Sequence, residues 1–167
     1  MQDGLTPAAD DTGTPRIGGV PLAEIADCNG FRLRRVARLM TAIFDERLGE
    51  AGLTSQQFVL LATIYGAMAG GRILSMTELA ELTGLDPTTL TRTLLPLKTA
   101  GWVTDSRADE DRRRRRIELT TSGEARLADG AKQWKAANQT VEMRLGQTLT
   151  AEIRTGLIAA LGRLGAD

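Results

Sequence analysis

Residues 75–100, SMTELAELTGLDPTTLTRTLLPLKTA, decide the fold of this chain. A capping-box pattern at the start of the stretch predicts a short helix over residues 77–83. Gly84 suits the left-handed position that ends such a helix. Asp86 is then a good N-cap for a second helix, which we expect over residues 87–100. Two helices joined by so short a turn predict a helix-turn-helix motif.

The residues that follow predict a β-hairpin. The pattern predicts a strand over residues 102–104 and its antiparallel partner over residues 117–120. A polar loop over residues 106–115 joins them. The helix-turn-helix and this hairpin together predict a winged helix. The fold class is therefore mainly α with a small β-hairpin wing.

Helical patterns flank the predicted winged helix on both sides. Apolar side chains recur at three- and four-residue spacing over residues 22–49. A capping box at Thr54 opens the next helix, and a further one is expected at Thr121. The last two helices extend towards the end of the chain, with a break near Gly146. Residues 1–20 hold few large apolar groups, so we expect a flexible tail there.

Composition excludes several classes of chemistry. The chain of 167 residues has no histidine and a single cysteine, Cys28. Catalysis by a Ser-His-Asp or Cys-His arrangement is therefore excluded, as are an internal disulfide and a thiolate-rich metal site. No apolar run approaches a membrane span, and the first residues lack a secretory signal pattern. We expect a cytoplasmic protein without cofactor, metal or membrane partner.

Charge is unevenly distributed, although 21 basic and 21 acidic residues cancel. Residues 1–27 hold five acids and one arginine, which leaves 20 basic and 16 acidic residues in the rest of the chain. Five consecutive arginines stand at residues 112–116, inside the hairpin loop. A hairpin beside a recognition helix can place such arginines over a minor groove, where the negative potential is concentrated. A solubilising loop is the alternative reading of this run.

The outward face of the second helix predicts contacts with DNA. Leu90, Leu94 and Leu97 form its inward stripe. The opposite face carries short hydroxyl side chains and one long cation, Arg92, which suits a bidentate contact with guanine. Threonines can contact phosphates, bases or thymine methyl groups, although capping and surface filling are the alternative for each of them.

Many segments in order resemble the multiple-antibiotic-resistance regulator (MarR) family. They are LTSQQFVLL at 53–61, TELA at 77–80, LDPTTLTR at 85–92, LKTAGWV at 97–103, and DRRRRRIELTTSG at 111–123. The resemblance covers about residues 28–165. It implies an obligate homodimer that binds a pseudo-palindromic operator as a transcriptional regulator, most often a repressor. The implied domains are a tail at 1–20, an N-terminal dimerisation helix at 21–53, the DNA-binding domain at 54–121 and C-terminal dimerisation helices at 122–167.

The resemblance also supplies candidate DNA-binding residues. The family's Asp-x-Arg wing signature falls on Asp111 and Arg113, so Arg113 is the expected minor-groove arginine, with Arg112 and Arg114 beside it. Family members contact phosphates from helix starts, where backbone N–H groups favour anions. The full set of candidates is Ser55, Gln56, Ser75, Thr77, Thr88, Thr89, Thr91, Arg92, Lys98, Asp111, Arg112, Arg113 and Arg114.

Members of this family are commonly released from DNA by a small phenolic or aromatic effector. The resemblance implies a cleft for such a molecule between the dimer helices and the winged helix. Phe58 and Tyr65 are candidate walls, and Arg34 and Arg38 could meet a carboxylate, although a solvated helix face explains both arginines as well. Cys28, at the start of the first helix, suggests an alternative function as a peroxide sensor. An inert cysteine is the competing reading.

Two further functions stay open on the sequence alone. Asp109, Glu110 and Asp111 form the one carboxylate cluster that could support metal-assisted hydrolysis, but six arginines in the same loop would pair with it. We therefore expect no enzyme, and we find no nucleotide-binding glycine motif. A winged helix that serves protein contacts alone is the other possibility, and the arginine-rich wing argues against it.

Overall fold

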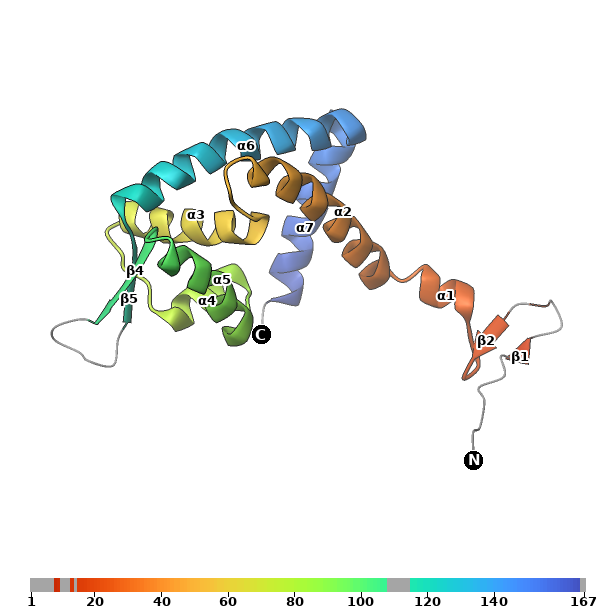
Figure 1. The fold of residues 1–167 in the computed structure, drawn as a ribbon. Coiled ribbons are helices and arrows are strands. Elements are labelled where there is room, and N and C mark those ends of the chain that lie inside the picture. Colours follow the sequence, from red (N-terminus) through yellow and green to blue (C-terminus); the bar gives the residue numbers. More distant parts are fainter. Residues whose placement is uncertain (1–7, 10–12, 14, 108–114, 166–167) are drawn as a thin grey trace. The chain divides into compact units, whose positions relative to one another are not determined.

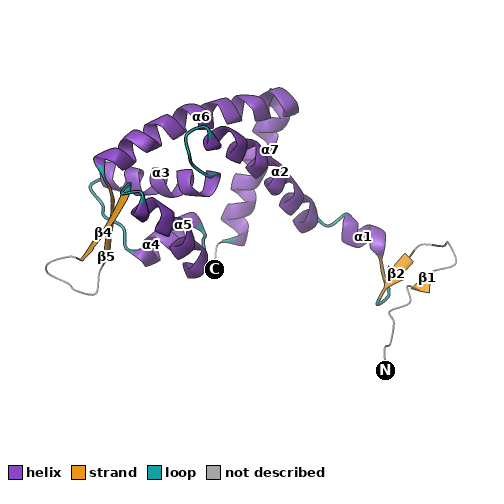
Figure 2. Ribbon diagram, in the orientation of Figure 1, coloured by secondary structure: helices purple, strands orange, loops and turns teal. Residues whose placement is uncertain are grey.

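The computed structural model describes residues 8–9, 13, 15–107 and 115–165 (Figure 1). The chain divides into two units, residues 1–41 and 42–167. Helices dominate both units, and the strands are short (Figure 2). No helix in the described part of the chain is long and apolar enough to cross a membrane.

The N-terminal unit combines short strands with helices. Strands β1 (Ala8–Ala9), β2 (Pro15–Ile17) and β3 (Val20–Pro21) form an antiparallel sheet in that order. The sequence pattern did not predict these strands. Helix α1 (Leu22–Ala26) follows, and α2 (Asn29–Gly49) begins in this unit and ends in the next.

The structure corrects the prediction of one continuous helix over residues 22–49. The helix is interrupted at Asp27 and Cys28, so Cys28 lies just before α2. The Cys28 carbonyl accepts hydrogen bonds from the backbone N–H groups of Phe31 and Arg32, at 3.0 and 3.1 Å. Asp, Asn and Gly in this segment have low helix propensity, which explains the break.

The second unit contains the winged helix. Its helices are α3 (Ser55–Ala69), α4 (Met76–Thr83), α5 (Pro87–Thr99), α6 (Thr121–Leu145) and α7 (Gln147–Leu164). Strands β4 (Val103–Arg107) and β5 (Arg115–Leu119) pair antiparallel, from Val103 opposite Leu119 to Arg107 opposite Arg115. An isolated bridge between Leu74 and Ile117 joins the chain before α4 to the hairpin.

Local capping patterns largely form as predicted. Thr54 and Gln57 close a capping box on α3, and Ser75 and Glu78 close one on α4. The expected box at Thr121 is wrong by one residue. The N-cap of α6 is Thr120, whose hydroxyl accepts from the N–H of Gly123 at 3.0 Å.

An apolar core holds the described part of the second unit together. The buried side chains come from α2, α3, α4, α5, the hairpin and the segments just before α3 and α4: Leu48, Leu53, Phe58, Leu60, Leu61, Ile64, Leu74, Leu79, Leu90, Leu94, Leu97, Val103, Ile117 and Leu119. Burial of such side chains contributes about 1.5–3 kcal/mol each. Helix α6 lies alongside α3 and contacts β5 (Figure 1).

Arg126 ties α6 to two other parts of this unit. Its guanidinium donates to the Ala51 carbonyl at 2.8 Å and lies over the Trp102 ring, 4.8 Å from the ring centroid. A planar guanidinium can make both contacts at once. The turn before α3, the start of the hairpin and α6 are therefore linked through one side chain.

Candidate nucleic-acid interface

Helix α5 has one buried face and one open face, as a recognition helix requires. Leu90, Leu94 and Leu97 are buried in the core. Thr88 and Arg92 are exposed on the other face. The open face near the helix N-terminus can therefore approach a groove without disturbing the core.

Asp86 holds the N-terminus of this helix in place. Its carboxylate accepts from the backbone N–H groups of Thr88 and Thr89, both at 3.0 Å. Hydrogen bonding from the Thr89 side chain, followed by that from its backbone, lowers the pKa of the Asp86 carboxyl below its usual value. The carboxylate therefore stays charged over the cap at neutral pH.

The threonines of α5 differ in what their hydroxyls do. The Thr91 hydroxyl donates to the Pro87 carbonyl at 2.8 Å, and the Thr91 side chain is exposed. Thr88 is also exposed, and Thr89 is half-buried. A hydroxyl that donates to its own helix still offers its oxygen lone pairs and its methyl group to a partner.

The start of α3 is tied to the recognition helix. The Gln56 side-chain oxygen accepts from the Thr93 hydroxyl at 3.3 Å. The Ser55 backbone N–H donates to the Asp45 carboxylate at 2.6 Å. The Gln56 side chain thus lies beside α5, while the N-terminus of α3 is tied to Asp45 of α2.

Helix α4 presents the other two predicted helix-start residues. The Ser75 hydroxyl is engaged in the capping box, where it donates to the Glu78 carboxylate at 2.8 Å. Thr77 is exposed in the first turn of the same helix. Ser75 therefore supports the helix, whereas Thr77 is open to a partner.

Lys98 pairs with a residue of the hairpin. Its ammonium lies 2.6 Å from the Asp105 carboxylate, whose side chain is only 9% exposed. This ion pair joins the end of α5 to strand β4. In this structure Lys98 therefore positions the wing against the recognition helix.

The predicted DNA-binding residues of the wing fall in the hairpin loop between β4 and β5. Asp111, Arg112, Arg113 and Arg114 lie outside the described residues, as do Asp109 and Glu110. The two strands that lead to them pair over five residues each and form the base of the wing. Among the described residues, no group of three or more acidic or cysteine side chains could hold a metal ion.

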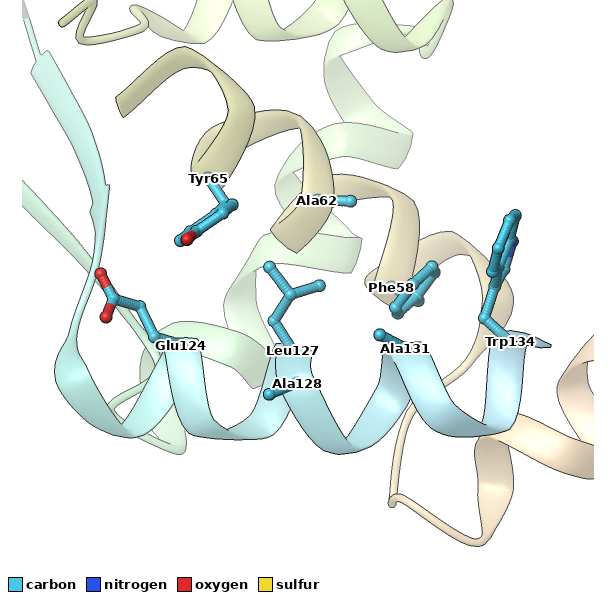
Figure 3. A pocket seen from close by; sticks show the side chains of 8 residues that line it. All are labelled: Phe58, Ala62, Tyr65, Glu124, Leu127, Ala128, Ala131 and Trp134. Carbon is cyan, nitrogen blue, oxygen red and sulfur yellow. The ribbon is translucent and has the colours of Figure 1, made fainter. Parts of the chain in front are cut away.

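A pocket opens between α3 and α6. It has a volume of about 510 Å³ and is lined by Phe58, Ala62, Tyr65, Glu124, Leu127, Ala128, Ala131 and Trp134. Figure 3 shows the side chains of α3 facing those of α6 across the space. The pocket includes two predicted effector residues, Phe58 and Tyr65.

The pocket wall on α6 was not predicted from the sequence. Its members share one helical face at spacings of three, four and seven residues, from Glu124 to Trp134. This periodicity is visible in the sequence, but it does not tell which neighbour the face meets. Arg34 and Arg38 are exposed on α2 in the N-terminal unit and are not among the lining residues.

Cys28 is exposed ahead of α2. Hydrogen bonding from the Phe31 backbone, followed by that from Gly30, lowers the pKa of the Cys28 thiol. The lowered pKa increases the thiolate fraction at neutral pH.

Comparisons with known proteins agree with this architecture. A family model described as the MarR family matches residues 51–114. The crystal structure of the transcriptional regulator MosR from M. tuberculosis is 34% identical, with a TM-score of 0.68, over 83% of this chain and 96% of that one. MosR has also been crystallised in complex with DNA, and that structure matches at 33% identity and a TM-score of 0.69 over the same shares.

A second relative comes from E. coli. The structure of a MarR mutant complexed with operator DNA is 25% identical, with a TM-score of 0.72, over 84% of this chain and 97% of that one. The helix order, the hairpin, the family model and the identity with MosR lead to one assignment. The chain belongs to the MarR family of winged helix-turn-helix transcriptional regulators.

Proposed function

We propose that this protein binds double-stranded DNA as a homodimer and regulates transcription at a pseudo-palindromic operator, as a repressor. The observation that carries the proposal is the exposed face of α5, which displays Thr88, Thr91 and Arg92 over a fully apolar inner face. Helix α5 then enters the major groove, and the starts of α3 and α4 contact the flanking phosphates. The relatives crystallised with DNA support this proposal.

Uncovered apolar residues support a homodimer. None of the residues described in α7 is buried, although the helix carries Leu157, Ile158, Leu161 and Leu164. Leu161 and Leu164 are 74% and 84% exposed. Contiguous apolar faces of this kind mark association surfaces. The N-terminal half of α2 likewise exposes Phe31 and Leu39.

The hairpin completes the proposed DNA contacts. Arg113 would enter the minor groove, oriented by Asp111, with Arg112 and Arg114 on the adjacent phosphates. A narrow minor groove favours arginine for electrostatic reasons. The ordered base of the wing and the pair between Lys98 and Asp105 support a fixed approach of the hairpin beside α5.

The test of DNA binding starts with selection of bound sequences from a random pool. Fluorescence anisotropy then measures the affinity for the selected duplex at several salt concentrations. Arg92→Ala should weaken binding by about 1–3 kcal/mol and relax the preference at one base pair, as loss of a bidentate guanine contact does. Lys135→Ala, on α6, is the matched control with the same change of charge. An equal effect of both variants would show that Arg92 adds only charge.

Analytical ultracentrifugation, which measures the molecular mass in solution, tests the dimer. Sedimentation of the wild type should give about twice the chain mass of 18.0 kDa. Leu161→Glu places a charge in the proposed interface and should give monomers that bind the operator much more weakly. A wild-type protein that is monomeric at micromolar concentration and binds DNA undiminished would refute the dimer.

Repression is tested with a reporter gene. We propose that a small molecule in the pocket between α3 and α6 lowers the affinity for DNA. A reporter gene behind the selected operator should be silenced by the wild type and restored by Arg92→Ala. Stimulation of the reporter by the wild type would instead identify an activator.

A further inference from the structure

The pocket between α3 and α6 brings together three aromatic rings and one carboxylate. The rings of Phe58 and Trp134 stack, with centroids 6.4 Å apart and planes 21° apart. At the other end, Tyr65 on α3 and Glu124 on α6 lie across from one another (Figure 3). Small and aliphatic side chains fill the middle of the wall.

The charge on the pocket wall is negative. No lysine or arginine is among the eight described residues that line the pocket, and Glu124 is the one charged group among them. A bound carboxylate would meet this acid without a counter-ion. An ammonium group would pair with the acid, and the faces of the aromatic rings would also attract it.

We infer that the pocket binds a hydrophobic organic cation. Such a molecule has an aromatic or aliphatic body and an amine or quaternary ammonium group at one end. Its body would occupy the apolar middle, against Phe58 and Trp134. Its charged end would lie by Tyr65 and Glu124. The cavity of about 510 Å³ has the size of a pocket for a drug-sized ligand.

A small molecule suits this pocket better than a segment of a second copy. The apolar faces left open for a second copy lie on α7 and on the N-terminal half of α2, whereas the pocket lies between α3 and α6. The pocket also ends at a carboxylate, which gives it a charge preference that a purely apolar interface lacks. The inference rests on the proposed function in one respect, because the cation acts as the effector that releases DNA.

Three probes with one ring system separate charge from size. They are naphthylmethylamine, which is cationic at neutral pH, the neutral naphthylmethanol, and the anionic naphthoic acid. Isothermal titration calorimetry of the full chain should show the amine binding about tenfold more tightly than the acid, with the alcohol between them. Equal or tighter binding of the acid would overturn the inference.

Three variants locate the site. Glu124→Gln keeps the size of the side chain and should bring the affinities of amine and alcohol together. Glu142→Gln, an exposed site on the same helix, makes the same change of net charge and should leave the preference intact. Ala131→Phe fills the pocket and should abolish binding of all three probes. If both glutamine variants alter the preference equally, the pocket does not select the cation.

The remaining outcomes separate this inference from the proposed function. The amine should weaken binding to the selected operator in the wild type, but not in Ala131→Phe. Amine binding that leaves the DNA affinity unchanged would overturn the effector role. If the wild type binds no probe and Ala131→Phe breaks up the dimer, a second copy covers the pocket and the inference fails. A protein that binds no duplex at all refutes the proposed function, while calorimetry still decides the ligand class.

Discussion

Gly123 is the position at which one added methyl group should do most harm. This residue is buried in the first turn of α6. A Cβ there would overlap the Trp102 carbonyl oxygen and lie 2.9 Å from its carbonyl carbon and 3.2 Å from a Leu119 methyl. The opposing atoms belong mainly to backbone, so they cannot rotate away. The helix start and strand β4 would have to separate.

The magnitude follows from that contact. Overpacking of a core costs about 1–3 kcal/mol, and occasionally more, when side chains can adjust. Here the separation would also break the hydrogen bond from the Thr120 N–H to the Trp102 carbonyl, now 3.1 Å long, and disturb the cap on α6. We expect Gly123→Ala to lower the free energy of unfolding by about 3–5 kcal/mol.

Urea unfolding followed by far-UV circular dichroism measures this loss. All variants are compared at one protein concentration, because dimerisation would make stability depend on it. Gly66→Ala, in α3, is the matched control, since a Cβ there meets nothing within 4 Å. Gly66→Ala should raise the free energy of unfolding by about 0.5–1 kcal/mol, because alanine favours a helix interior more than glycine does. A loss below about 1 kcal/mol for Gly123→Ala would refute the close approach of α6 to the hairpin.

Four further predictions follow from the described contacts. The lowered pKa of Asp86 means that its stabilising effect is present above the usual aspartate pKa and is lost as the pH falls through the lowered value; Asp86→Asn should flatten this acid dependence in unfolding experiments. A double-mutant cycle between Lys98 and Asp105 should give a coupling of about 0.5–1 kcal/mol, and no coupling would remove the proposed support of the wing. Arg126→Lys should lower stability by about 1–2 kcal/mol, because an ammonium cannot make both contacts of the guanidinium; an unchanged unfolding midpoint would contradict this. Alkylation of Cys28 should reach half its maximal rate at a pH below the usual thiol pKa, and a midpoint at the usual value would argue against the backbone hydrogen bonds as its cause.

Local chemistry explains which elements the sequence predicted well. The boxes at Thr54 and Ser75 and the cap at Asp86 each form within four consecutive residues, so their outcome depends little on the rest of the chain. Gly84 adopts a φ of 66°, as a C-terminal glycine of a short helix is expected to. The family assignment rests on many such local segments in order.

The errors fall where several weak preferences compete. Thr120 and Thr121 are both good N-caps, and the hydrogen bonds of Thr120 with Gly101 and Gly123 decide between them. The break before α2 follows from a few residues of low helix propensity. The prediction of one continuous helix rested on the apolar periodicity and gave these residues too little weight. Periodicity records which residues share a face, but not where a helix is interrupted.

Residues alone were enough to identify a winged helix, its recognition helix and its family, because caps, turns and apolar stripes are short-range properties. The arrangement of the candidate DNA-binding surface and of the pocket required the tertiary structure. Lys98 is a plausible phosphate contact in the sequence, yet in the fold it faces Asp105 and supports the wing. The pocket likewise arises only when α6 packs on α3, more than fifty residues away, and brings Glu124 opposite Tyr65. Its charge, and hence the ligand we propose, depends on that long-range packing, because the pairing of two distant faces is not written in the periodicity of either one.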